Sequence, residues 1–195
     1  MSDASLMESH GAAVHGKRSG RGFTLIELLV TLSVAAILLG LAVPAFSSYV
    51  KNSRLTTEAD TLLYALTLAR SEAVKLDTSV EVCASNDRAT CSGTWADGWI
   101  VLCPANCPAA LGPSPALLQA EPPINASNSV TEEIAGATAV GFLSAGQTTG
   151  ANFQFVFCDS RGPGSGRDVE INSVGEIAAA SNPGETVAGA PLGAC

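Results

Sequence analysis

One nearly uncharged stretch close to the N-terminus constrains this chain more than any other feature. Residues 28–43 carry no charge, and counting back to Phe23 gives a stretch of 21 residues that only Glu27 interrupts. At about 1.5 Å per residue, a helix of this length spans about 31 Å. That length matches the hydrocarbon core of a bilayer. The sequence therefore predicts a single membrane-spanning helix.

The charges on either side of the stretch predict its orientation. Lys17, Arg18 and Arg21 precede it, and the next cation is Lys51. Positive residues favour the cytoplasmic side of a membrane. A secretory signal would place its cleavage site after the apolar run, whereas the favoured cleavage site here lies before it. We therefore expect the N-terminus in the cytoplasm and everything after the helix across the membrane.

The residues at the start of the stretch form a recognisable motif. The string Gly22-Phe23-Thr24-Leu25-Ile26-Glu27 and the apolar run resemble the class III signal of type IV pilins and type II secretion pseudopilins. The resemblance implies that prepilin peptidase removes a leader, residues 1–22, and methylates the new amine of Phe23. It also implies that Glu27 pairs with an N-terminal amine during subunit assembly.

A physical argument supports a role for Glu27 independently of the resemblance. A lone carboxylate near a membrane span costs a few kcal/mol and usually marks a functional contact. The amine of Phe23 lies one helical turn away in the same chain, and a staggered neighbouring subunit offers another. The sequence leaves both partners open.

The helix is expected to continue beyond the membrane. Pro44 lacks the N–H that would bond to the Gly40 carbonyl, which predicts a kink. Further on, apolar residues recur at spacings of three and four, as on a buried helix face. We expect one kinked helix from about Phe23 to Leu76, with 23–50 as the transmembrane and assembly half and 51–76 packed on a sheet. The expected buried positions are Leu55, Ala59, Leu62, Leu66, Ala69, Ala73 and Leu76.

Alternating apolar residues after Asp77 predict strands. The expected strands cover 79–84, 98–103 and 139–143, the run from Phe153 to Phe157, and Val169 with Ile171. They predict an antiparallel sheet and an α+β fold, with a head of residues 51–195 that is β-rich from residue 77. Residues 104–129 hold six of the ten prolines and are expected to form a long loop. The tail from Ala178 has a disordered composition, although Cys195 indicates that it is tied down.

All six cysteines follow the membrane span, where an even count predicts disulfides. The spacings favour pairing across a turn, across a short loop, and from a strand to the tail. A zinc site is the rival, but a C-x3-C pair without histidine fits zinc poorly. The expected pairs are Cys83 with Cys91, Cys103 with Cys107, and Cys158 with Cys195.

Composition excludes several functions. The net charge is -8 and the pI is near 4.6, so the chain lacks the broad cationic field that draws proteins to nucleic acids. Both histidines, His10 and His15, precede the expected cleavage site. The processed chain would therefore have no imidazole for a catalytic site or a zinc site. We expect no enzymatic activity, no cofactor and no metal.

Two groups of polar residues remain as candidates for chemistry. Carboxylates occur at Glu132 with Glu133 and at Asp168 with Glu170. Neighbours in sequence point apart on a strand, and we interpret both groups as solvated charges. Residues 161–167 read Arg-Gly-Pro-Gly-Ser-Gly-Arg but lack the Lys-Ser/Thr ending of a phosphate-binding loop. We interpret them as a flexible hairpin loop.

The head also resembles the GspH/FimT-like minor pilins and pseudopilins. The features that carry the likeness are Leu68-Ala-Arg70-Ser-Glu72-Ala-Val74, Val80-Glu-Val-Cys83, Cys91 before Trp95, Gly98-Trp99-Ile100-Val101, Phe142-x-x-x-Gly146 and the run from Phe153 to Cys158. FimT-type members of some bacteria bind DNA with a C-terminal Gly-Arg-x-Arg motif. At the matching place this chain reads Gly-Glu-Ile-Ala over residues 175–178. Arg161 and Arg167 are then the only nearby cations for DNA, and Asp168 and Glu170 partly neutralise them.

These observations and resemblances lead to one principal hypothesis. The chain is expected to be a minor type IV pilin that is held in the inner membrane, with its head in the periplasm, and then enters the pilus, where it primes assembly. Its expected partners are major and minor pilins, through the N-terminal helix, and prepilin peptidase. A GspH-like pseudopilin of the type II secretion system is the first alternative. A FimT-like DNA receptor is disfavoured, and a simple single-span membrane protein is the remaining alternative.

Overall fold

The computed structural model describes residues 22–132, 137–150, 152–193 and 195. The chain comprises two units, residues 1–44 and 45–195. A single helix, α1 (Leu25–Leu76), belongs to both. Thr24 caps its first turn, because the Glu27 N–H donates to the Thr24 side-chain oxygen at 3.2 Å. The helix therefore begins two residues after the expected start, and residues 1–21 of the expected leader lie outside the described residues.

The described part of the head contains two four-stranded sheets, not the one that the alternation predicted. The first, in the order β3-β2-β1-β5, contains β1 (Val80–Ala84), β2 (Trp99–Cys103), β3 (Ala116–Ala120) and β5 (Ala139–Phe142). The second, in the order β4-β6-β7-β8, contains β4 (Asn128–Glu132), β6 (Phe153–Asp159), β7 (Arg167–Ile171) and β8 (Ile177–Ala179). Three short 3-10 turns, η1 (Trp95–Asp97), η2 (Ala109–Leu111) and η3 (Pro163–Ser165), lie between strands. Every pairing is antiparallel, so the predicted α+β class is confirmed.

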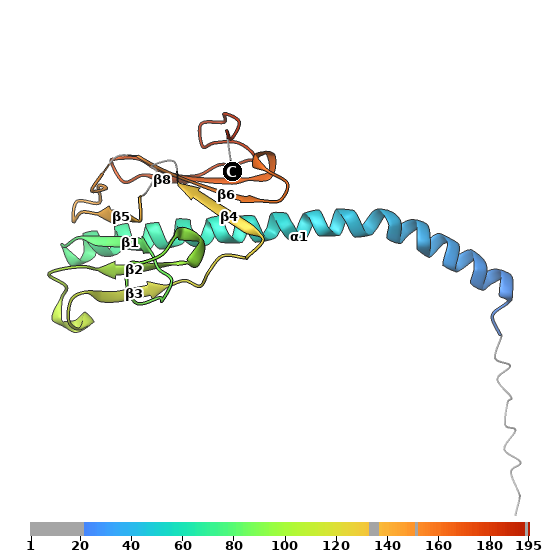
Figure 1. Ribbon diagram of the computed structural model, residues 1–195, viewed down its shortest axis with the longest axis horizontal. Helices are drawn as coiled ribbons and strands as arrows, with labels where there is room; N and C mark the ends of the chain where they lie inside the picture. Colours follow the sequence, from blue (N-terminus) through green and yellow to red (C-terminus); the bar gives the residue numbers. More distant parts are fainter. Residues whose placement is uncertain (1–21, 133–136, 151, 194) are drawn as a thin grey trace, which may run out of the picture. The chain divides into compact units, whose positions relative to one another are not determined.

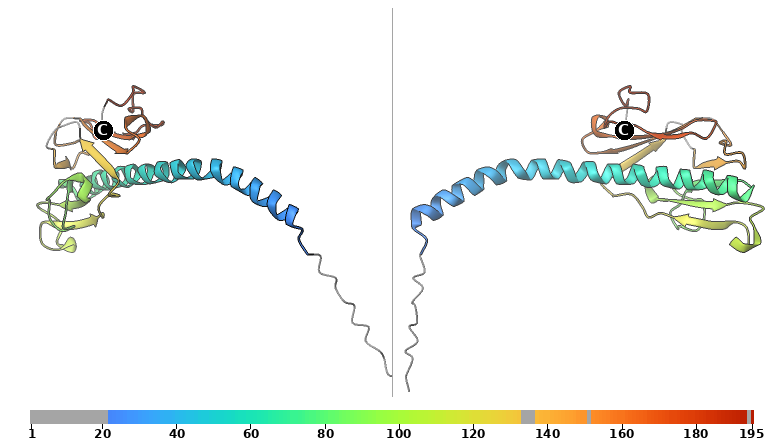
Figure 2. Two further views of the ribbon diagram at one scale, coloured as in Figure 1. Left: turned by 45° about the vertical axis from the view of Figure 1, so that its right-hand side comes forward. Right: turned by 180° about the vertical axis from the view of Figure 1, so that it is seen from behind.

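The second half of α1 explains why there are two sheets. Figures 1 and 2 show it between them, with β1 to β3 on one side and β4, β6 and β8 on the other. One buried cluster joins the helix to Val82 and Trp99 of the first sheet and to Phe155 and Phe157 of the second. A helix buried on two sides allows each sheet to bury one face. The buried helix residues are Leu55, Ala59, Leu62, Ala65, Leu66, Ala69 and Ala73, which confirms the predicted stripe except for half-buried Leu76.

The interpretation of residues 104–129 as a long loop was wrong. The segment contains η2, all of β3 and the first residues of β4. Prolines flank β3 at positions 113, 115, 122 and 123, and none lies within it. A proline removes a ladder hydrogen bond only where it lies inside a strand. The five-residue strand between them therefore pairs with β2, from Ile100 opposite Ala120 to Cys103 opposite Ala116.

The C-terminal tail is ordered in part, against the indication of its composition. Strand β8 pairs with β7, and Glu185 forms a bridge with Pro191. The disulfide between Cys158 and Cys195, with Cα atoms 5.8 Å apart, joins the end of the chain to β6. The other two disulfides join Cys83 to Cys91 and Cys103 to Cys107. These are the three pairs that the spacings favoured.

Candidate functional site

The first part of α1 presents an apolar surface that its own unit does not cover. Every large apolar side chain from Phe23 to Val43 is more than half exposed, and Phe23 is 80% exposed. The mean hydropathy of the most apolar 18-residue window of α1 is 2.5, long and apolar enough to cross a membrane. Apolar area on this scale requires cover by lipid or by other helices.

Glu27 is the only ionisable side chain of this surface. No Asp, Glu, Lys or Arg occurs from Leu28 to Val50. The hydroxyls of Thr31 and Ser33 donate to the carbonyls of Leu28 and Leu29 at 2.9 and 2.8 Å, so the helix satisfies them internally. Within the described residues, no hydrogen bond or ion pair engages the Glu27 carboxylate. The segment therefore combines an uncovered apolar surface with one carboxylate in its first turn.

Pro44 lies inside α1, and the helix continues through it to Leu76. The proline therefore does not end the helix, and the kink stays a prediction.

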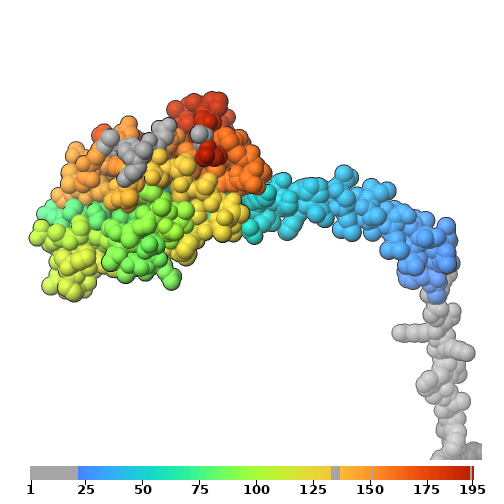
Figure 3. Space-filling view, viewed as in Figure 1, coloured from blue at the N-terminus to red at the C-terminus, as the bar shows by residue number. Residues whose placement is uncertain are grey.

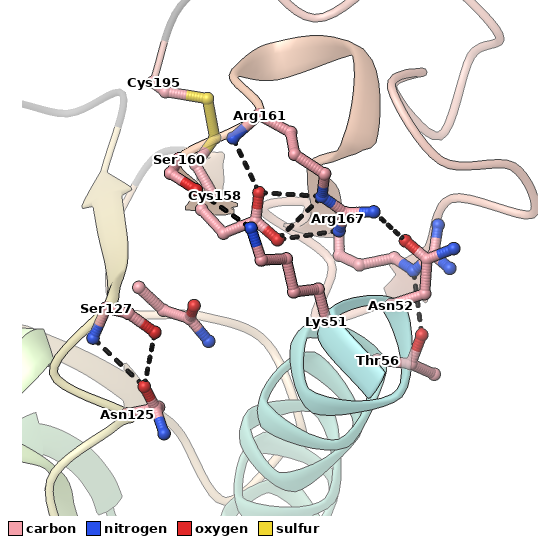
Figure 4. A network of polar contacts seen from close by, with 12 residues as sticks. Lys51, Asn52, Thr56, Asn125, Ser127, Cys158, Ser160, Arg161, Arg167 and Cys195 are labelled. Carbon is pink, nitrogen blue, oxygen red and sulfur yellow. Dashed lines mark hydrogen bonds and ion pairs between the residues drawn. A yellow bond between two sulfur atoms is a disulfide. The ribbon is translucent and has the colours of Figure 1, made fainter. Parts of the chain in front are cut away.

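A polar network joins the β6–β7 connection to α1 within the head (Figure 4). The Arg161 guanidinium donates from Nε and Nη2 to the Asp159 carboxylate, with the shortest distance 2.6 Å. Its Nη1 donates to Oδ1 of Asn52 at 2.7 Å. The Asp159 side chain is 3% exposed, and hydrogen bonding from Arg161 lowers its pKa below the usual 3.8. Arg161 therefore fastens the loop after β6 to the helix.

Two further cations belong to the same network. Arg167 donates from Nε to the Thr56 hydroxyl at 2.9 Å. Lys51 donates to the Ser160 hydroxyl at 3.2 Å. The two cations that remained as candidates for DNA contact, Arg161 and Arg167, are thus half-buried and bonded to helix residues. Their positions favour a role in docking the loop onto α1. The flexibility that the glycine-rich sequence indicated stays a prediction.

The turn that matches the DNA-binding motif is closed by its own side chains. The Glu176 N–H donates to Asn172 Oδ1, and Asn172 Nδ2 donates to Glu176 Oε2, both at 2.9 Å. Gly175 allows the turn with a φ of +82°. The turn presents a carboxylate where the motif needs cations.

The interpretation of Asp168 and Glu170 as solvated charges was wrong for Asp168. Two positions apart on β7, they share one face, and both accept a hydrogen bond from the Val187 N–H at 3.1 Å. Asp168 is 1% exposed. Glu132 is half-buried at the end of β4, and Glu133 lies outside the described residues.

Among the described residues, Glu81, Cys83 and Cys91 are the one group with metal-ligand spacing. The two cysteines form a disulfide, so they offer no thiolate to a metal.

Sequence reasoning missed most of the docking network. Asn52, Thr56 and Asp159 belong to no sequence motif. Only the spacing of two residues between Asp159 and Arg161 indicates an ion pair. The remaining bonds join positions more than 100 residues apart, for which one sequence holds no local signal.

Comparisons with known proteins agree with the geometry. Residues 58–175 match the family model of the type II transport protein GspH, and residues 17–43 match the prokaryotic N-terminal methylation motif. The chain is similar to the prepilin peptidase-dependent protein D of Escherichia coli, with 38% identity over 64 residues. That match covers 33% of this chain and 36% of the curated relative, so the chain spans about a third of that relative's length.

A solved structure of a minor pilin shares the fold. The type IV minor pilin FimU of Pseudomonas aeruginosa is 22% identical and superimposes with a TM-score of 0.53, covering 67% of this chain and 90% of FimU. The minor pseudopilin EpsH of Vibrio cholerae is 14% identical, with a TM-score of 0.48 over 65% of this chain and 95% of EpsH.

Proposed function

This chain belongs to the family of the type II transport protein GspH, and from that premise we propose that it is a minor type IV pilin. In this function it is a low-abundance subunit that primes assembly of the filament and enters it through the first half of α1. It has no catalytic role of its own.

One observation carries the proposal. The helix that supports the packed head begins with an apolar surface, residues 23–43, that nothing in its own unit covers. Lipid covers such a surface before assembly, and equivalent helices of other subunits cover it afterwards. Glu27 then provides the one charged group that can select a partner amine in these apolar surroundings.

We assign processing and location on the same basis. Prepilin peptidase removes residues 1–22, and the amine of Phe23 is methylated, in keeping with the methylation motif over residues 17–43. The subunit then remains in the inner membrane, with residues 51–195 in the periplasm, where the three disulfides are stable. Its partners are major and minor pilins.

A pseudopilin of the type II secretion system is the second candidate. The description of the matching family, a type II transport protein, favours it. Both functions use the same helix and the same head. DNA uptake is not favoured, because Arg161 and Arg167 are bonded to Asp159, Asn52 and Thr56.

A deletion strain tests the choice between the two machines. The amount of pilin sheared from the cell surface is measured in the deletion strain and in its complemented parent, with extracellular enzyme secretion assayed in the same cultures. Lost pili with intact secretion is the expected result. Intact pili with lost secretion would instead assign the protein to the pseudopilus of the type II secretion system.

Intact mass tests the processing step. In cells with prepilin peptidase, the mature chain is expected to begin at methylated Phe23. Retention of residues 1–22 in such cells would instead indicate a simple membrane protein with one span.

A further inference from the structure

The C-terminal strap, defined here as residues 180–193, covers the outer face of the second sheet. Figure 3 shows the strap in red on the orange strands β6 and β7. The Ala180 N–H donates to the Asp168 carbonyl and the Gly184 N–H to the Gly166 carbonyl, both at 3.0 Å. Leu192 is 7% exposed and packs with Val156. The strap is therefore docked at both ends, and its middle lies over β7.

Two carboxylates hold the middle of the strap through a single donor. The Val187 N–H donates to Oδ2 of Asp168 and to Oε1 of Glu170, both at 3.1 Å. The other oxygen of Asp168, Oδ1, is buried without a hydrogen-bond partner. One N–H cannot satisfy two ionised carboxylates, and a buried ionised oxygen without a partner costs several kcal/mol. The two carboxylates therefore lack one hydrogen-bond donor if both are ionised.

We propose that Asp168 and Glu170 form a proton-dependent clasp, in which one proton shared between the two carboxyl groups closes the strap and its loss loosens the strap. In the closed state the protonated Asp168 donates its O–H to the Glu170 carboxylate, which accepts from the same Val187 N–H. A remaining oxygen of the pair accepts the Val187 N–H. On deprotonation the proton goes to solvent, and two negative charges then compete for that N–H.

The surroundings of the pair favour the protonated form. Burial, together with hydrogen bonding and charge from Glu170, raises the pKa of Asp168 from 3.8 to about 6. Gln154 of β6 and the Val187 N–H oppose the shift. A raised pKa means that the closed strap binds the proton more tightly than the open one, so closure is favoured at low pH and weakens as the pH rises through about 6.

Other charged groups lie near the pair on the neighbouring elements. Glu176 of the β7–β8 turn lines the same hollow as Glu170. On the helix side, Asp60 of α1 and Arg167 line a small hollow of 130 Å³ together with Asp168. Arg167 donates to Thr56. On the strap, the Glu185 carboxylate accepts from Asn182 at 2.9 Å. Within the described residues, no ion pair joins a cation to Asp168 or Glu170, so no cation offsets their mutual repulsion.

Opening of the clasp would change the surface of the sheet. Thr186 and Val187 of the strap form one wall of a hollow of 430 Å³, whose floor includes Gln154 and Ile171. The disulfide of Cys195 keeps the end of the strap attached to β6 while the middle moves. The clasp therefore controls access to the outer face of β6, β7 and β8.

Amide hydrogen exchange of the full oxidised chain in detergent micelles tests the clasp. The measured quantity is the protection factor of the strap amides around Val187 at pH 5 and pH 8, after correction for intrinsic exchange. With the pKa at 3.8 in the open state and about 6 in the closed state, protection is expected to be about tenfold higher at pH 5. Amides of Phe155 and Phe157 in β6 serve as internal controls and are expected to change little. Equal protection of the strap at both pH values would overturn the proposal.

Variants separate the clasp from general effects of pH. In D168N the Asn can donate to Glu170 without a titrating proton, so strap protection is expected to be high and independent of pH. E170Q removes the repulsion and is expected to reduce the pH dependence as well. D60N removes an exposed carboxylate of α1 and is expected to retain the tenfold change. If D168N does not fold, the pH dependence of strap protection in E170Q and in the wild-type chain tests the proposal instead. An unchanged tenfold pH dependence in E170Q would contradict the clasp.

Discussion

Single residues join parts of the head that are distant in sequence. Arg161 connects the loop after β6 to Asn52 of α1 while it pairs with Asp159. Gly175 lies against the Gly146 carbonyl, so the β7–β8 turn contacts the loop after β5. In the first case one side chain fixes how a loop meets the helix. In the second case the absence of a side chain allows two loops to approach each other closely.

Arg161→Ala is expected to destabilise the head by about 2–3 kcal/mol. The variant leaves the nearly buried Asp159 carboxylate without its cation, and an unpaired buried charge is costly. Urea unfolding of the full chain in detergent, followed by the fluorescence of buried Trp95 and Trp99, measures the change. The matched control, Arg54→Ala on an exposed part of α1, is expected to cost less than about 0.5 kcal/mol. Equal losses in the two variants would contradict the assigned role.

Gly175→Ala is expected to destabilise more than Gly162→Ala, although both glycines have a φ of +82°. A Cβ at residue 175 would overlap the Gly146 carbonyl oxygen, whereas at residue 162 it would meet open space. Backbone strain of about 1–3 kcal/mol applies to both, and overlap adds about 1–3 kcal/mol for Gly175 alone. The same urea titration compares the variants, and equal costs would show that overlap is relieved at no cost.

At the scale of elements, α1 has two halves with opposite surroundings. From Phe23 to Val43 its apolar side chains are exposed, and from Leu55 to Ala73 its buried face belongs to the core. The one helix therefore serves two purposes. The second half packs in the core of the head, and the apolar surface of the first half is left for lipid or other helices to cover.

Glu27→Ala is expected to leave membrane insertion intact and to reduce incorporation into filaments at least tenfold. Removal of the charge makes the apolar segment easier to insert, but it removes the group that selects a partner amine. Immunoblots of the membrane fraction and of sheared filaments measure both quantities. Ser33→Ala is the control, because the Ser33 hydroxyl bonds to its own helix. Normal incorporation of the Glu27 variant would refute the assembly role.

At the scale of the whole head, one helix, two sheets and three disulfides all contribute to stability. The disulfides close loops of very different length, from a separation of 4 residues for Cys103–Cys107 to 37 for Cys158–Cys195. Longer loops restrict the unfolded chain more strongly. The disulfide at the end of the strap is therefore expected to contribute most.

Replacement of Cys158 and Cys195 together by alanine is expected to cost about 4 kcal/mol, on the chain-entropy estimate for a loop of this length. Replacement of Cys103 and Cys107 is expected to cost about 2 kcal/mol on the same basis. Urea unfolding of both variants gives the comparison. The reverse order would show that local packing, and not loop closure, sets these contributions.

Much of this architecture follows from local patterns in the sequence. The uncharged run from Leu28, the helical stripe from Leu55 and the alternation of Phe153 to Phe157 are periodic signals, and the structure has the corresponding elements. The cysteine spacings led to the three pairs that the structure contains. Each of these signals lies within one element or a short stretch of chain. It can therefore be interpreted without knowing which other elements pack against it.

Tertiary structure decided the rest. The proline-rich segment forms β3 only because β2 offers it an edge, and two sheets form because α1 is buried on both sides. The docking of Arg161 on Asn52 and the meeting of Val187 with Asp168 join residues 109 and 19 positions apart. Such contacts depend on how elements pack in space. A periodic pattern specifies which face of an element is buried, but not which distant side chain it meets there.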